Sequence, residues 1–332
     1  MSESRPNEAT CGYGRIACLL IASLGLSTIL SATQLSPSTI LFTTQLSPSP
    51  TSVRLTITNG CTKDPLWIAN FAFQAPFFTQ DFKLNAGDRV NYTIPNEGLA
   101  ATRFWAKWGC DDSGSNCLIG QSGGPGESCP AKGCAPPIDS KFEATFGCMP
   151  GTDKCAVNPS DPSQTLLPID FWDTSLMDGW TLPYKVEVVG NCPNMKTKTI
   201  DCSKLTLDAC PTNENLNTTG IQSLLLTTKN GTAVGCFAPC TKLTSPVVTQ
   251  GLNFPIKSPE AAPYCCPTPP ISPDACRKGP IVNTQFVQTV HTLCPNVYAY
   301  SYDDGVGLAT CPAGTRYDVT FYCPSEAMKV RL

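Results

Sequence analysis

The chain has 332 residues, which is enough for one large domain or two smaller ones. Its net charge is −3 and it contains no long basic stripe, so neither nucleic acid nor an anionic membrane surface is an expected partner. The single histidine, His291, excludes a multi-histidine metal site, and we expect neither a metal nor a cofactor.

Residues 1–32 are predicted to be a targeting segment. An uncharged, largely apolar stretch at 16–32 follows Arg15, and it is short for a membrane span but fits the core of a cleaved signal peptide. A retained signal anchor is the alternative, because a cut after Ala32 would leave Leu30, rather than a small residue, three positions back. Either way the rest of the chain reaches the secretory lumen, so we expect a secreted protein, held at a membrane only if this segment is retained.

Residues 33–52 form a Ser/Thr/Pro-rich spacer that contains the string TQLSPS twice. Such a composition cannot bury a core, and it predicts an extended stalk open to O-glycosylation. Three N-glycosylation sequons, at Asn91, Asn217 and Asn230, predict a glycoprotein with these positions at its surface.

Alternation of apolar and polar residues predicts the strands of the remaining chain. These strands are Val53–Thr58, Asp88–Ile94, Arg103–Trp108, Lys185–Val189, Tyr298–Tyr302 and Tyr317–Tyr322. Helical spacing of apolar residues is clearest at Asn283–Leu293, which is the helix candidate. Between Cys192 and Cys276 cysteines crowd together while periodicity fades, which indicates a loop-rich region held by crosslinks.

Of the twenty cysteines, Cys11 and Cys18 lie in the targeting segment, and eighteen follow from Cys61 to Cys323. An even, dense set without repeated paired-ligand spacing is typical of disulfides formed in an oxidising compartment. Zinc is the alternative, but the chain offers no fitting second pair of ligands.

Six strings occur in a characteristic order: TITNGC, RFWAKWGC, DFWDTSLMDGWTLP, YCC, LCPNVYAYSYDD and VTFYCP. In this order the chain resembles the thaumatin-like (pathogenesis-related group 5) family from about residue 53 to about 325. The resemblance implies a mainly β fold, a flattened β-sandwich with a disulfide-rich loop/helix subdomain. We therefore expect a monomeric domain at 53–326, with the sandwich at 53–190 and 295–326 and the subdomain at 191–294.

The resemblance also implies a disulfide map. Seven pairs follow the family: Cys61–Cys323, Cys110–Cys117, Cys192–Cys311, Cys202–Cys294, Cys210–Cys236, Cys240–Cys265 and Cys266–Cys276. Two pairs depart from it. Cys129–Cys134 is a local substitute where the family's T-G-D-C motif is replaced by IGQS, and Cys148–Cys155 is an extra bridge on an inserted loop.

The resemblance further implies an acidic cleft lined by one Arg, one Glu and three Asp. By motif these fall on Arg103 in RFW, Glu143 in FEA, Asp173 and Asp178 in WDTSLMDG, and Asp304 in YSYDD. Polysaccharides suit such a set, because carboxylates accept hydrogen bonds from sugar hydroxyls and Arg donates them.

Three aromatic residues, Trp105, Phe171 and Trp172, are candidates to pack against the apolar faces of sugars. Core or wall positions are the alternative for the two tryptophans.

Hydrolysis of a polysaccharide needs a carboxylic acid that protonates the leaving oxygen and a second carboxylate that activates water or attacks the sugar. Glu143 is the candidate acid, and Asp173 or Asp178 the candidate base; Asp139 replaces Glu143 if that side chain points elsewhere. Structural interpretations stand beside these roles, because Asp before Gly favours turns and Arg103 could serve a structural ion pair.

Three functions are considered from the resemblance and from these residues. The first is a defence-type, antifungal protein that binds β-1,3-glucan without efficient cleavage. The second is an endo-β-1,3-glucanase that uses the cleft carboxylates. The third is a non-catalytic extracellular scaffold, displayed on a cell surface by the N-terminal segment. The residue set argues against the third function and does not choose between the first two.

Overall fold

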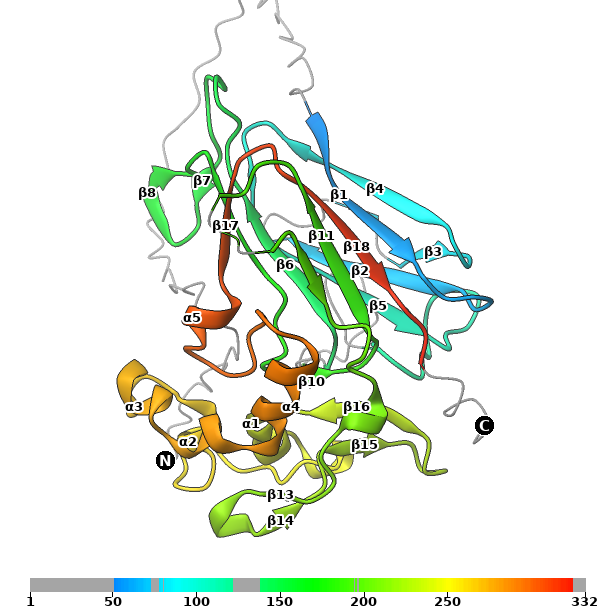
Figure 1. The fold of residues 1–332 in the computed structure, drawn as a ribbon, viewed down its shortest axis with the longest axis vertical. Helices are drawn as coiled ribbons and strands as arrows, with labels where there is room; N and C mark the ends of the chain where they lie inside the picture. The colour runs from blue at the N-terminus through cyan, green and yellow to red at the C-terminus, as the bar shows by residue number, and fades with distance from the viewer. Residues whose placement is uncertain are drawn as a thin grey trace, which may run out of the picture.

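The computed structural model describes residues 51–72, 78–79, 81–121, 138–193, 195 and 197–324. Two large β-sheets stack against each other, and most of the small sheets and short helices gather at one end of the stack, whereas one two-stranded sheet lies towards the other end (Figure 1). The predicted targeting segment and almost all of the spacer lie outside the described residues, as does the predicted pair Cys129–Cys134. The predicted mainly β sandwich with a disulfide-rich loop/helix subdomain is confirmed.

The first sheet has five strands, which pair antiparallel except for β1 with β18. In spatial order they are β12 (Thr199–Asp201), β11 (Tyr184–Val189), β18 (Arg316–Phe321), β1 (Thr51–Asn59) and β4 (Arg89–Pro95). In β1 every second side chain from Leu55 onward is buried, which is the alternation expected of a strand with one face on the core.

The second sheet has six antiparallel strands. In spatial order they are β17 (Ala309–Pro312), β9 (Ile169–Asp173), β6 (Lys141–Phe146), β5 (Leu99–Trp108), β2 (Leu66–Ala72) and β3 (Phe82–Leu84). Strands β9, β6 and β5 are neighbours, so the outer face of this sheet brings together side chains from three distant parts of the chain.

Aromatic rings join the two sheets. Trp172 of β9 packs on Tyr317 of β18 with 5.1 Å between ring centroids, and Phe142 of β6 contacts both rings. A buried polar network crosses the same interface, because Asp170 forms an ion pair with Arg54 of β1 and accepts a hydrogen bond from the Tyr317 hydroxyl. This rigid core fixes the relative position of β6 and β9.

Small elements complete the fold. The minor strands are β10 (Gly179–Trp180), β15 (Leu225–Thr227), β16 (Ala233–Phe237), β13 (Glu214–Asn215), β14 (Ile221–Gln222), β7 (Val157–Asn158) and β8 (Asp161–Thr165). The α-helices are α1 (Pro239–Thr244), α2 (Ala262–Cys265), α3 (Pro273–Arg277), α4 (Gln285–Leu293) and α5 (Asp304–Gly307). Short 3-10 turns are η1 (Leu207–Ala209), η2 (Asn217–Thr219), η3 (Val247–Thr249) and η4 (Pro280–Asn283).

Helix α4 confirms the helix predicted at Asn283–Leu293, except that Asn283 belongs to the preceding 3-10 turn and Thr284 is the N-cap. The Thr284 hydroxyl caps it by accepting from the Val287 N–H, and the Glu214 carboxylate accepts from the first two helical N–H groups. Its buried face holds Phe286, Val287 and Val290. Among the described residues, no helix has both the length and the apolar character that a membrane crossing requires.

Eight predicted disulfides are present in the described part of the chain. They are Cys61–Cys323, Cys110–Cys117, Cys148–Cys155, Cys192–Cys311, Cys202–Cys294, Cys210–Cys236, Cys240–Cys265 and Cys266–Cys276. Cys61–Cys323 joins the ends of β1 and β18, which are already parallel neighbours in the sheet. The three sequon asparagines, Asn91, Asn217 and Asn230, are exposed.

One predicted strand is wrong. The stretch Tyr298–Tyr302 forms only an isolated bridge, between Tyr298 and Ser175, and then turns. A hydrogen bond and a backbone angle accompany the turn. The Asp303 carboxylate accepts a hydrogen bond from the Ala299 N–H, and Tyr302 has a positive φ of 69°. The other five predicted strands fall on β1, β4, β5, β11 and β18.

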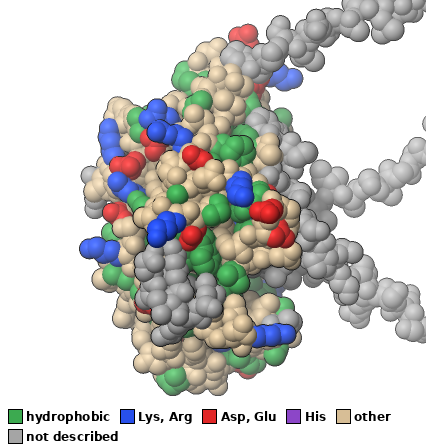
Figure 2. Space-filling view, turned by 90° about the vertical axis from the view of Figure 1, so that its right-hand side faces the viewer, with side chains coloured by type: hydrophobic (Ala, Val, Ile, Leu, Met, Phe, Trp, Pro, Cys, Tyr) green, Lys and Arg blue, Asp and Glu red, His purple; other side chains and the backbone are tan. Residues whose placement is uncertain are grey.

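Figure 2 shows the molecule from the right-hand side of Figure 1. On this face acidic and basic side chains are interspersed, with hydrophobic side chains between them. Some ion pairs of the protein are open to solvent; the side chains of Lys83 and Asp112 lie 3.8 Å apart and both are exposed. Exposed pairs of this kind contribute little to stability.

Candidate functional site

Three of the predicted site residues form a row across the outer face of the six-stranded sheet. Arg103 of β5 lies directly opposite Glu143 of β6, and Glu143 lies directly opposite Asp173 of β9. Residues opposite each other in antiparallel strands point to the same face and are close neighbours. The guanidinium is buried and the two carboxyl groups are half-buried.

Three further charged residues, Asp139, Lys141 and Asp178, adjoin the row. Arg103 donates two hydrogen bonds to the buried Asp139 carboxylate, at 2.8 and 2.9 Å. The Lys141 ammonium contacts the same carboxylate at 3.2 Å and the Asp178 carboxylate at 2.6 Å. We call the six residues Arg103, Asp139, Lys141, Glu143, Asp173 and Asp178 the carboxylate cluster. Each cation of the cluster is therefore neutralised by a carboxylate inside the protein.

The partner of Arg103 is thus Asp139, in agreement with the structural ion pair that sequence reasoning kept as an alternative. Lys141 was not foreseen, because a lysine in an alternating strand is expected to face solvent. Its place on β6 could have been found from the pattern Asp139-Ser-Lys141-Phe-Glu143, which puts three charges on one face of a strand.

Burial and mutual charge shift the proton affinities in the cluster. Burial raises the pKa of Glu143, an effect that Lys141 and Arg103 offset only in part. Burial and the neighbouring Glu143 charge raise the pKa of Asp173 well above its usual range. Two adjacent carboxyl groups with raised pKa values favour a state in which they hold a proton between them.

Two buried polar atoms of the cluster lack a hydrogen-bond partner among the described residues. They are Oδ1 of Asp173 and Nε of Arg103. A buried polar atom without a partner is costly, so such atoms point to a missing ligand or water.

Asp304 approaches the cluster through a tyrosine. It accepts a hydrogen bond from the Tyr298 hydroxyl at 2.8 Å and forms an ion pair with Arg277 at 3.0 Å. Burial, together with the charges of Asp304 and Asp173, raises the pKa of the Tyr298 hydroxyl above its usual range. Tyr298 therefore lies within electrostatic reach of both carboxyl groups, and no direct contact joins Asp304 to the cluster in the described structure.

The sequence model of the Thaumatin family matches residues 59–324. The chain belongs to the thaumatin family. It is 30% identical over 256 residues to a glucan endo-1,3-beta-glucosidase from Prunus avium, an alignment that covers 74% of this chain and 80% of that protein. It is 28% identical to thaumatin-like protein 1 from Pyrus pyrifolia, over 73% of this chain and 79% of that protein. It is also 28% identical to pathogenesis-related thaumatin-like protein 3.5 from Cryptomeria japonica, over 74% of this chain and 78% of that protein.

In this thaumatin-family protein the two tryptophans predicted as sugar platforms are buried. Trp105 is 2% exposed, and its indole donates to the Gly120 carbonyl while its ring faces Arg103. Trp172 is 1% exposed and packs in the core between the sheets. Neither tryptophan has a free face for a sugar, so the prediction of a sugar platform is wrong for both. The structure places them at core or wall positions, which was the alternative prediction.

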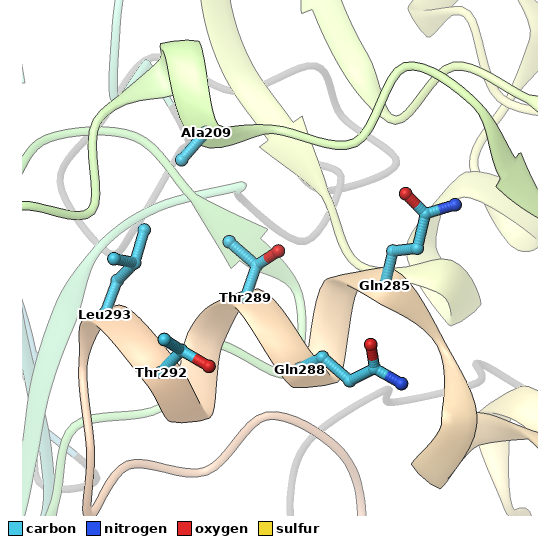
Figure 3. Close-up of a pocket in the computed structure, with 6 residues that line it drawn as sticks. All are labelled: Ala209, Gln285, Gln288, Thr289, Thr292 and Leu293. Atoms are coloured by element: carbon cyan, nitrogen blue, oxygen red, sulfur yellow. The ribbon is translucent and has the colours of Figure 1, made fainter.

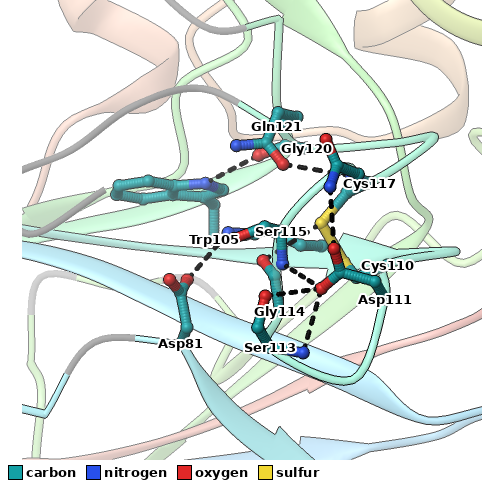
Figure 4. Close-up of a disulfide and its surroundings, with 12 residues drawn as sticks. Asp81, Trp105, Cys110, Asp111, Ser113, Gly114, Ser115, Cys117, Gly120 and Gln121 are labelled. Atoms are coloured by element: carbon teal, nitrogen blue, oxygen red, sulfur yellow. Dashed lines mark hydrogen bonds and ion pairs between the residues drawn. A yellow bond between two sulfur atoms is a disulfide. The ribbon is translucent and has the colours of Figure 1, made fainter. Parts of the chain in front are cut away.

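The loop beside Trp105 is self-contained (Figure 4). It is closed by Cys110–Cys117, and the exposed Asp111 carboxylate accepts hydrogen bonds from Ser113, Ser115 and Asn116. These hydrogen bonds lower the pKa of Asp111 below its usual range. The carboxylate is engaged within its own loop.

An open hollow of about 400 Å³ lies on α4 (Figure 3). Its lining is uncharged and shares no residue with the carboxylate cluster: Ala209, Gln285, Gln288, Thr289, Thr292 and Leu293. His291, on the same helix, contacts the buried Asp303 carboxylate at 2.9 Å. No group of three or more His, Cys, Asp or Glu side chains able to hold a metal occurs in the described part of the chain.

Proposed function

We propose that this chain is a secreted, defence-type protein that binds neutral β-1,3-glucan at the carboxylate cluster, within the acidic cleft predicted from sequence. The observation that carries the proposal is the cross-strand row of Arg103, Glu143 and Asp173. It gathers, on one sheet face, groups that accept and donate hydrogen bonds to sugar hydroxyls. The half-buried carboxyl groups of Glu143 and Asp173 are the groups of this row that a ligand can reach.

The charge balance of the cluster favours an uncharged glycan. Asp139 and Asp178 neutralise Arg103 and Lys141, so neither cation is available to an anionic sugar. The groups left for a ligand are the carboxyls of Glu143 and Asp173. A uronic acid or sulfated chain would bring a like charge to them, and like charges at short range disfavour binding.

A second candidate function is an endo-β-1,3-glucanase. It is favoured by the adjacency of Glu143 and Asp173 and by the raised pKa of Glu143, the candidate acid. In that mechanism the protonated Glu143 gives its proton to the glycosidic oxygen as the bond to the sugar breaks. Water then attacks the anomeric carbon and loses a proton to the second carboxylate, Asp173 or Asp178. The Prunus avium relative, which carries the name of such an enzyme, supports this candidate.

The experiment is a pull-down on insoluble β-1,3-glucan, run beside an assay of reducing-end release from soluble glucan. Wild type is compared with Glu143→Gln and with Glu187→Gln, a control at an exposed position of β11. If wild type is retained on the insoluble glucan and none of the three proteins releases reducing ends, the binding function is supported. Release that is lost only in Glu143→Gln, while retention persists, supports the glucanase. A wild-type protein that neither binds nor cleaves would overturn both and leave the scaffold.

The secreted location has its own test. N-terminal sequencing of the mature protein distinguishes a cleaved signal peptide, which the proposal expects, from a retained anchor. A mature protein that still begins at residue 1 would contradict a freely secreted form.

A further inference from the structure

An exposed apolar strip lies beside the carboxylate cluster on the same sheet face. It consists of Ile169, Phe171 and Leu308, whose exposed fractions are 38%, 42% and 47%. Phe171 is in the middle of β9, an internal strand with β17 on one side and β6 on the other. A large aromatic side chain held open to solvent on an internal strand has no structural need to be there.

The strip continues the row of the cluster along β9. Side chains alternate along this strand, so Ile169 and Phe171 share a face with Asp173. Phe171 precedes Asp173 by two residues, which corresponds to about 7 Å along a strand. Leu308 precedes Ala309, the residue opposite Trp172, and therefore falls beside Asp173 at the edge of the sheet.

A hydroxyl group borders the strip on the side of β6. Thr145 lies directly opposite Phe171, two residues beyond Glu143. Its oxygen accepts a hydrogen bond from the Ala101 N–H, which leaves the hydroxyl hydrogen to donate to a ligand. An apolar platform with a polar group at its rim is the arrangement that recognises sugar rings, which have apolar faces and hydroxylated edges.

We propose that the strip is a second sugar subsite, in which the Phe171 ring stacks on a pyranose of the same glucan chain whose neighbouring unit is held by Glu143 and Asp173. The inference rests on the proposed glucan binding and adds to it that recognition extends along β9. Its occupant is the glycan chain, because the strip is continuous with the cluster and separated from it by about one sugar unit. The buried tryptophans cannot take this role.

The test compares Phe171→Ala with Phe82→Ala. Phe82 is a matched control, because it is 41% exposed and lies on β3, at the opposite edge of the same sheet. Binding of β-1,3-linked glucose oligomers of increasing length is measured by titration calorimetry. Phe171→Ala is expected to bind long oligomers about tenfold more weakly. Binding of the shortest oligomers, and all binding by Phe82→Ala, is expected to stay at the wild-type level.

Equal binding of long oligomers by wild type and Phe171→Ala would overturn the subsite, as would an equal loss in Phe82→Ala. If wild type and Phe171→Ala bind long oligomers equally well, only the subsite fails and the proposed glucan binding stands. If wild type binds no oligomer, the proposed function fails with it. A wild-type dimer that Phe171→Ala converts to monomer in sedimentation would assign the strip to a second copy of the chain and overturn the inference. Should Phe171→Ala not fold, Phe171→Leu removes the flat ring while keeping an apolar side chain, and the same loss is expected.

Discussion

Replacing Lys141 with Met tests the internal charge balance of the carboxylate cluster. The Lys141 side chain is 1% exposed and lies between the carboxylates of Asp139, which is fully buried, and Asp178, which is 24% exposed. Methionine fills a similar volume without the charge. The substitution therefore leaves Asp178 without its counter-ion and Asp139 with Arg103 alone, while the packing of β6 is largely kept.

The expected cost follows from the burial of the partners. Removing one member of a buried ion pair costs about 3–5 kcal/mol of unfolding free energy, because the remaining charge is desolvated and uncompensated. At roughly 2–4 °C per kcal/mol, Lys141→Met should lower Tm by on the order of 10 °C. Lys185 is the matched control, since it pairs with Glu187 at 3.0 Å on a strand but both side chains are partly exposed. Lys185→Met should cost about 0–1 kcal/mol.

The assay is thermal and denaturant unfolding of the disulfide-intact protein, followed by circular dichroism. Combining Lys141→Met with Asp178→Asn should recover part of the loss, because the uncompensated carboxylate is then neutral. A Lys141→Met variant as stable as Lys185→Met would refute the reasoning, and so would a double variant whose losses simply add.

Three further outcomes are expected. Glu143→Gln should raise Tm at pH 7 more than at pH 4. Burial raises the pKa of Glu143, so the wild-type protein loses stability as pH rises above the ordinary pKa of a glutamate and through the raised pKa of Glu143. Equal gains in Tm at both pH values would argue against this. Asp303→Ala should cost about 1–3 kcal/mol in denaturant unfolding, because the Ala299 N–H and His291 lose a buried acceptor, whereas the exposed Asp274→Ala should cost under about 1 kcal/mol. Carboxymethylated glucan should bind more weakly than neutral glucan in calorimetry, and the difference should shrink with added salt; tighter binding of the charged polymer would contradict a cluster with neutralised cations.

The alternation of apolar and polar residues was sufficient to predict a strand where the strand has one buried face. In β1, β4, β11 and β18 the alternation of the sequence is the alternation of burial. It failed for β2, nearly all of whose residues are buried, because a strand covered on both faces shows no period of two. It also failed at Tyr298–Tyr302, where the Asp303 carboxylate turns an alternating stretch into a loop.

The site could be predicted only as far as motifs reach. The resemblance named Arg103, Glu143 and Asp173, and the sheet register then made them neighbours. The role of Lys141 depends on what covers the outer face of β6, which no local pattern encodes. The same holds for the exposure of Phe171 beside the buried Trp172, since neighbouring residues of one strand face opposite sides of the sheet.

The most direct measurement is a crystal structure of the protein with a bound β-1,3-linked glucose oligomer. The account predicts a sugar hydroxyl within about 2.6–3.2 Å of the carboxyl oxygens of Glu143 and Asp173, with the next ring over Phe171. An oligomer bound only in the hollow on α4, or none at saturating concentration, would contradict it.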